Sequence, residues 1–324
     1  MSTKLAVVFL LFSSGSLAAP MHLDLGGLVL VLSDSPTAQL FHIVDQLSQW
    51  DTYSHKQYVR WAEKTQLLDQ RDHELLLQQA KMRKERGSGH GFEQTFLVDD
   101  SIENAAAKGI AEGYLSKDEA NTERDILLHF APKLQPLLSE RQVEIARLQQ
   151  QLESERERLT PIVRQLARFA EVKDPLTVAV FLVANTDERN GGGEANGGRL
   201  VIEVPSPDAI GTLLHESLHR LLESQRGPIR SAAEAAALDF TALNEGIAYA
   251  LYPGITADTE AGDRLVEQLV RMQLRGAPAS DRYLQFDLIA VVIRPLLRAA
   301  LLHNETITTF LPKATAKWRG IASR

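Results

Sequence analysis

The sequence of 324 residues contains no cysteine. This absence excludes disulfide bonds, thiolate metal ligands, a catalytic thiol and bacterial lipid attachment. An exported domain of this size without disulfides has to be held together by its apolar core, with a bound metal as a further source of stability.

The chain also lacks an excess of positive charge. Its 35 Lys and Arg residues stand against 42 Asp and Glu residues, which gives a formal net charge of -7. Because nucleic-acid binding draws its affinity from clustered basic side chains, we expect no nucleic-acid partner, and no acidic substrate either. The hydrophobic content of 44% is that of a globular protein with one large core or two smaller ones.

An apolar run long enough to cross a membrane is missing from the N-terminus. Residues 5–12 are apolar, but these eight residues are far short of the roughly 20 that a spanning helix needs. Lys4 precedes the run, and Ser16-Leu17-Ala18 follows it as a small-x-small cleavage site. We therefore predict a signal peptide over residues 1–18, no membrane span after its removal, and a secreted or periplasmic protein.

Helical periodicity dominates the next part of the chain. After a short run with strand character at residues 28–32, Ser35-Pro36 opens a long stretch of apolar residues at helical spacing. Breaks are expected at the glycines around Ser88 and at Pro132 and Pro136. The expected helices cover residues 37–50, 53–86, 101–115, 117–131 and 139–169. The sequence thus predicts a mainly helical region over residues 19–172.

The last of these helices has two interpretations. Leucine and isoleucine residues recur at spacings of three, four and seven from Leu134 to Leu166, as in a coiled coil. Arg141 and Glu155 interrupt this seam and Pro161 lies inside it, which favours a single amphipathic helix packed on its neighbours. Self-association through this helix is kept as the alternative.

Further strand signals appear only in the second half of the chain. Residues 176–183 are apolar and β-branched, residues 199–204 alternate, and the glycine-rich residues between them are typical of a hairpin tip. Ser206-Pro207-Asp208 predicts the start of a helix, with Ser206 as its N-cap, and Gly227-Pro228 predicts its end. We predict a second domain over residues 173–324.

That predicted helix contains the H-E-x-x-H pattern, as His215-Glu216-Ser217-Leu218-His219. Residues four apart on a helix lie one above the other, so both imidazoles can bind the same metal ion, about 2 Å from each nitrogen. The intervening Glu216 faces the same cleft and can take a proton from a metal-activated water. The remaining histidines are scattered without ligand spacing and are expected to be structural.

A catalytic zinc needs a third protein ligand and an open position for water. The candidate is Glu245, in a helical segment that ends at Pro253-Gly254. A helix beginning near Asp239 or Thr241 would bring Glu245 level with the paired histidines, and Gly246 would let the two helices approach closely. The prediction fails if the Glu245 side chain lies more than about 6 Å from the imidazoles.

With these two motifs the chain resembles the gluzincin metallopeptidases, in which H-E-x-x-H is followed on a later helix by a glutamate ligand, often as E-G-x-A. The second motif here is Glu245-Gly246-Ile247-Ala248, and the resemblance covers about residues 175–255. It implies an α+β, predominantly helical protein: a helical N-terminal region and a zincin-like metallopeptidase core with a small sheet. It also implies that residues 199–204 are the edge strand that pairs with an extended peptide. Some gluzincins carry an acid where this chain has Tyr249, so the group that orients the histidines is unassigned.

The expected function is hydrolysis of peptide bonds in a peptide or protein substrate, with one Zn2+ on His215, His219 and Glu245 and with Glu216 as general base. A further donor usually stabilises the oxyanion of such a reaction. The candidates are Tyr249 first, then Tyr252, Tyr283 and His303. The alternative function is a non-catalytic zinc-containing binding or adaptor protein that uses the helical region, but the intact Glu216 favours the enzyme.

Overall fold

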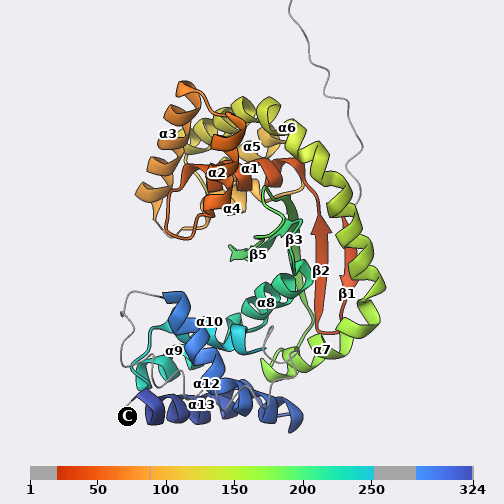
Figure 1. Ribbon diagram of the computed structural model, residues 1–324, viewed down its shortest axis with the longest axis vertical. Helices are drawn as coiled ribbons and strands as arrows, with labels where there is room; N and C mark the ends of the chain where they lie inside the picture. The colour runs from red at the N-terminus through yellow and green to blue at the C-terminus, as the bar shows by residue number, and fades with distance from the viewer. Residues whose placement is uncertain (1–19, 88, 252–281, 323–324) are drawn as a thin grey trace, which may run out of the picture.

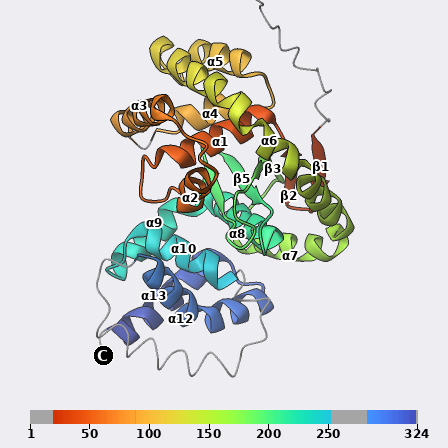
Figure 2. The ribbon, with the colours of Figure 1, turned by 45° about the horizontal axis from the view of Figure 1, so that its top comes forward.

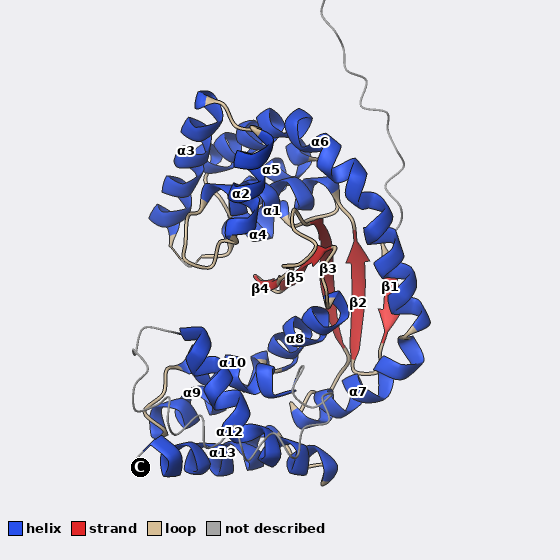
Figure 3. Ribbon diagram, in the orientation of Figure 1, coloured by secondary structure: helices blue, strands red, loops and turns tan. Residues whose placement is uncertain are grey.

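The computed structural model describes residues 20–87, 89–251 and 282–322, and the predicted signal peptide lies outside these ranges. The described residues form a predominantly helical α+β structure with a small mixed sheet, which confirms the predicted fold class at this level (Figure 3). The strands are β1 (Met21–Asp24), β2 (Leu28–Ser33), β3 (Leu176–Ala184), β4 (Gly193–Asn196) and β5 (Arg199–Val204). They lie in the order β1-β2-β3-β5-β4. Strands β2, β3 and β5 are parallel, whereas β1 and β4 pair antiparallel at the two edges.

The helical region is one long connection between two neighbouring strands. Strands β2 and β3 pair in parallel, with Leu28 opposite Leu176, and a parallel pair requires a crossover connection. The crossover contains α1 (Pro36–Ser48), α2 (Lys56–Thr65), α3 (Gln70–Arg86), α4 (Gly91–Phe96), α5 (Ile102–Ala111), α6 (Lys117–Ser154) and α7 (Arg156–Phe169). The sheet therefore takes strands from both sides of residue 172 and joins the two regions predicted from the sequence.

The sheet has two apolar faces, because successive residues of a strand point to opposite sides. On β3, Val180 and Leu182 belong to the core that also holds α7 and the C-terminal helices. Phe181 and Val183 belong to a second core, under the crossover helices α1 and α6. The apolar run at residues 178–184 of β3 is what burial on both faces requires.

Helix α6 runs through both prolines that were expected to end it. That prediction was wrong: α6 continues to Ser154, and the break lies at Glu155 instead. Pro132 and Pro136 are four residues apart on the exposed side of the helix, so the carbonyl groups that lose a helical partner can bond to water. Figure 1 shows the long α6 curving down past β1.

The leucine seam from α6 into α7 is buried inside the chain. This burial supports the single-chain interpretation, since the seam is covered without a second copy, and self-association through it stays a prediction. The buried seam residues are Leu134, Leu138, Ile145, Leu148, Leu152, Leu159 and Leu166.

The C-terminal helices begin with α8 (Ala209–Leu221), whose N-cap is Asp208 rather than the predicted Ser206. The carboxylate of Asp208 accepts a hydrogen bond from the backbone N–H of Gly211. Gly227-Pro228 does not end this helix, as was predicted, but lies in the first turn of α9, where a proline loses no helical hydrogen bond. The other elements are η1 (Glu223–Gln225), α9 (Arg226–Ala235), α10 (Phe240–Leu251), α12 (Arg282–Leu302) and α13 (Ile307–Ala322). Figure 2 shows α10, α12 and α13 grouped together, with α8 between them and the sheet.

A buried charge cluster lies in the core of the helical region. Arg83 is 4% exposed, and its guanidinium forms an ion pair with Asp45 and donates a hydrogen bond to Glu93. The fully buried Glu123 accepts a hydrogen bond from Gln79. Burial raises the pKa of Asp45 to about 6 and that of Glu123 to about 8. With one cation among three carboxyl groups, Glu123 is held in its neutral form at neutral pH.

We expect Glu123→Gln to stabilise the protein at alkaline pH but not at acidic pH. Glu123 of the unfolded chain ionises near its ordinary pKa of 4.5, whereas in the folded protein it stays neutral up to a pH of about 8. Its contribution to the free energy of unfolding is therefore fully present below pH 4.5 and is lost as the pH rises through about 8. The amide does not titrate, so the gain in unfolding free energy should grow across this window to on the order of 2–4 kcal/mol. Urea unfolding at acidic and alkaline pH measures it, with the exposed Glu103→Gln as control. A gain that does not depend on pH would contradict the assignment.

Candidate metal centre

Two histidines of α8 and one glutamate of α10 converge in the structure. Nε2 of His215 and Nε2 of His219 lie 3.2 Å apart, and each lies 3.4 Å from Oε2 of Glu245. The separation is well inside the limit of about 6 Å that the sequence argument set for the Glu245 side chain. Among the described residues, these three form the group that can hold a metal ion.

Packing against the sheet fixes the position of α8. Its apolar residues Leu213, Leu214 and Leu218 are buried in the core shared with β5. On the same face of the sheet, a side chain at Gly193 of β4 would place its Cβ 2.9 Å from Cγ of Glu216. Because position 193 is a glycine, β4 can lie directly against the helix face that carries Glu216.

Helix α10 begins where the sequence argument expected it. The carboxylate of Asp239 accepts a hydrogen bond from the backbone N–H of Thr241, and Leu243 and Ile247 are buried in the core. The role predicted for Gly246 was wrong. A Cβ there would lie 2.4 Å from Cγ2 of Ile289, so this glycine lets α10 approach α12 rather than α8.

The three ligand atoms fit a small tetrahedral ion. Bonds of about 2 Å at tetrahedral angles place neighbouring ligand atoms about 3.3 Å apart, close to the 3.2 and 3.4 Å found here. Both distances from the glutamate oxygen are longer than an ordinary N–H···O hydrogen bond, which makes a simple hydrogen-bonded cluster a poorer description. Two neutral nitrogen donors and one carboxylate form a donor set that zinc accepts.

The carboxyl groups of the centre have opposite electrostatic environments. Burial raises the pKa of Glu216 to about 7, although its electrostatic interaction with His215 acts to lower it. Burial also acts to raise the pKa of Glu245, but its interactions with His215 and His219 lower it to about 2. Glu245 is therefore an anionic ligand, and Glu216 is a carboxyl group that can both accept and release a proton near neutral pH.

Asn244 supplies the histidine contact that the sequence left unassigned. Nδ2 of its side-chain amide lies 2.9 Å from Nδ1 of His219, the ring nitrogen that does not face Glu245. An Nε2 lone pair is free for a metal only when Nδ1 carries the proton. Asn244 accepts that proton when its amide is turned over, so that Oδ1 takes the place of Nδ2. The signal for this residue was present in the sequence, directly before Glu245, but the direction of its side chain is a property of α10 in place.

The predicted oxyanion donors differ in their position relative to the cleft. The ring of Tyr249 lies 4.7 Å from the ring of His215, edge to face, and Tyr249 lines the cleft. His303 is exposed in the turn after α12 and is not among the residues that line the cleft. Tyr252 and the side chain of Tyr283 lie outside the described residues.

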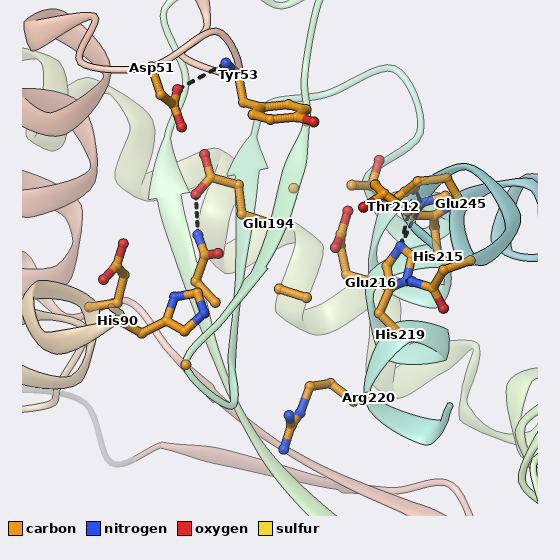
Figure 4. A pocket seen from close by; sticks show the side chains of 18 of the residues that line it. Asp51, Tyr53, His90, Glu194, Thr212, His215, Glu216, His219, Arg220 and Glu245 are labelled. Atoms are coloured by element: carbon orange, nitrogen blue, oxygen red, sulfur yellow. Dashed lines mark hydrogen bonds and ion pairs between the residues drawn. The ribbon is translucent and has the colours of Figure 1, made fainter. Parts of the chain in front are cut away.

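The centre opens into a cleft with a volume of about 1180 Å³, lined by both the C-terminal part and the helical region. Figure 4 shows His215, His219 and Glu245 together on one side, with Glu216 beside them. Glu194, His90 and the Asp51–Tyr53 loop lie across the pocket from this group. The crossover helices therefore form the second wall of the site.

The edge strand beside this cleft is β4, and the edge position predicted for residues 199–204 was wrong. Those residues form β5, which lies between β3 and β4. The glycine-rich segment that resembled a hairpin tip itself pairs as a short strand, with Glu194 opposite Val201 and the turn at Gly197-Gly198. Residues of β4, and none of β5, line the cleft together with the metal ligands.

Comparison of the chain with protein-family models, with curated proteins and with solved structures finds no match. The function therefore has to be inferred from the geometry of the site.

We expect Asn244→Ala to weaken metal binding about 10- to 100-fold, because His219 loses the amide group that contacts its Nδ1 and can accept the proton there. Competition with a colorimetric zinc chelator measures the affinity. Asn244→Asp keeps an acceptor oxygen at that position and should bind zinc at least as tightly as the wild type. Equal weakening by both substitutions would show that Asn244 acts only through packing.

Proposed function

We propose that this protein is a zinc-dependent peptidase of the gluzincin kind. The observation that carries the proposal is the convergence of His215, His219 and Glu245 at ligand distances, with Glu216 buried beside them at the wall of an open cleft. A metal site with a purely structural role does not require a carboxyl group in the position of Glu216. A cleft of this volume also exceeds what a small metabolite needs and suits an extended chain.

The residues divide the work of hydrolysis between them. A divalent ion held by the three ligands supplies Lewis acidity, which lowers the pKa of a water molecule and polarises a carbonyl group. Glu216 takes a proton from the attacking water as its oxygen bonds to the carbonyl carbon. The same carboxyl group then gives that proton to the amide nitrogen as the C–N bond breaks, so that a carboxylic acid and an amine leave. Tyr249, packed on His215, is the candidate donor to the oxyanion.

The proposal includes export of the mature chain to the periplasm or the exterior. Its basis is the N-terminal pattern of Lys4, the apolar residues 5–12 and the Ser16-Leu17-Ala18 cleavage site. Within the described part of the chain, no helix is both long and apolar enough to span a membrane. A peptidase that acts outside the cytoplasm meets extended or unfolded protein chains as substrates, which the open cleft can receive.

We expect the purified protein to contain one zinc per chain and to cleave casein, and Glu216→Gln to lose about 10²- to 10⁴-fold in kcat with the zinc retained. The amide is close in shape but cannot accept the proton of water. Elemental analysis and a fluorescent casein assay measure both quantities. Glu234→Gln, the same change at an exposed position of α9, should leave both unchanged. Equal activity of the wild type and Glu216→Gln would remove the catalytic proposal and leave a zinc-containing binding protein.

We expect chelation to lower the melting temperature by several degrees, because zinc binds only the folded arrangement of its ligands. At a zinc concentration of about 100 Kd the bound ion contributes about 2.7 kcal/mol. Differential scanning fluorimetry with and without 1,10-phenanthroline measures the shift. His219→Ala removes a ligand and should abolish it, and a chelator effect of equal size in that variant would point to metal binding elsewhere.

A further inference from the structure

We propose that His55, from the helical region, is a substrate-binding residue that donates a hydrogen bond from Nε2 to a backbone carbonyl oxygen of the peptide in the cleft. This inference rests on the proposed function and extends it, because it assigns part of the substrate site to the crossover helices. His55 is the N-cap residue of α2 and lines the same cleft as the metal ligands.

A buried carboxylate holds the His55 ring in place. Oε1 of Glu203, on β5, accepts hydrogen bonds from Nδ1 of His55 at 2.8 Å and from Nε2 of His42 at 3.1 Å. Its other oxygen accepts from the side chain of Gln57 and from the backbone N–H of Gly192. Glu203 has no exposed surface, so these bonds replace its contact with water.

The second ring nitrogen of His55 remains available to a ligand. The side chain is 29% exposed, and in the described part of the chain Nε2 has no hydrogen-bond partner. The backbone N–H of His55 donates to the side-chain oxygen of Gln46 at 2.6 Å, so the main chain of His55 is held as well as its ring. His42 makes the same contact with Glu203 but is 3% exposed and does not line the cleft.

The edge strand leads from His55 to the metal centre. A Cβ at Gly192 would lie 2.4 Å from Cε1 of His55, and a Cβ at the next residue, Gly193, would lie 2.9 Å from Cγ of Glu216. Successive strand residues point to opposite faces, so His55 and Glu216 flank the beginning of β4 from its two sides. A peptide lying at this edge is therefore within reach of both residues.

The charges around His55 select a neutral acceptor. Although burial by itself lowers the pKa of His55, the hydrogen bond and charge of Glu203 and the charges of Glu194 and Asp51 raise it to about 9. The ring is then a cation that can only donate from Nε2. The same carboxylates repel an anionic ligand, so a peptide carbonyl is favoured over a free carboxylate.

The test measures binding without cleavage. In a Glu216→Gln background, a dye-labelled peptide that spans the casein bond cleaved fastest by the wild type is titrated against the protein, and the Kd is read by fluorescence anisotropy. Adding His55→Gln should raise the Kd about 10- to 100-fold, the range of one hydrogen bond from a charged donor. Adding His42→Gln, which also removes one contact to Glu203, should change it by less than about threefold.

The comparison with His42 separates binding from folding. Melting temperature and zinc content are measured for each variant, and all titrations are run well below the lowest melting temperature. An unchanged Kd in the His55 variant, or equal weakening by both histidine substitutions, would overturn the proposal. If His55→Gln does not fold, Gly192→Ala replaces it: the added methyl group displaces the ring while keeping the imidazole, and an unchanged Kd would again overturn the proposal.

The chemical identity of the acceptor is tested with the same peptide carrying a free or an amidated C-terminus. His55→Gln should reduce the affinity for both forms of the peptide by the same factor. A loss of affinity for the free acid alone would overturn the proposal that His55 binds a backbone carbonyl, and would show that it binds the C-terminal carboxylate instead. A wild-type protein that cleaves no peptide would instead contradict the proposed function, whereas wild-type cleavage with His55→Gln unchanged in Kd and in KM contradicts the role of His55 alone.

Discussion

The candidate site depends on the fixed distance between α8 and α10. Three ligand atoms have to lie within 3.2–3.4 Å of one another, although they come from two separate helices. Leu218 on α8 and Ile247 on α10 are buried in one core, and Gly246 lets α10 pack closely on α12 behind it. A shift of either helix by 1 Å would exceed the tolerance of about 0.2 Å that metal bonds allow, so the apolar packing is what determines the geometry of the polar site.

The helical region takes part in this arrangement through the sheet. It is a single crossover between the adjacent strands β2 and β3. The core under α1 and the first part of α6 lies on the face of the sheet opposite to α8, whereas the end of α6 and α7 share the core of α8. Glu203 connects the two parts, because it lies on β5 and accepts hydrogen bonds from His42 of α1 and from His55 and Gln57 of α2. The second wall of the cleft is therefore hydrogen-bonded to β5, the neighbour of the edge strand β4.

The differences between the predicted and the observed elements have local physical reasons. Periodicity identified most helices, but prolines at exposed positions of α6 were expected to end it, since their effect depends on which side of the helix faces water. The glycine-rich segment before β5 was interpreted as a loop, because a four-residue edge strand has little apolar signal of its own. His42 and His55 carried no sequence signal, since their common partner Glu203 lies far away along the chain.

By itself, the sequence determined what depends on short-range order. The i, i+4 spacing of His215 and His219 puts both imidazoles on one face of a helix wherever that helix lies. Asp239 caps the start of α10 and so determines in which turn of that helix Glu245 lies. Only the tertiary structure decided the rest. It places Glu245 near both histidines, Asn244 against Nδ1 of His219, and His55 in the same cleft as Glu216. These contacts join segments that are distant in the chain, and their geometry follows from how buried side chains fill the space between elements, which local pattern does not encode.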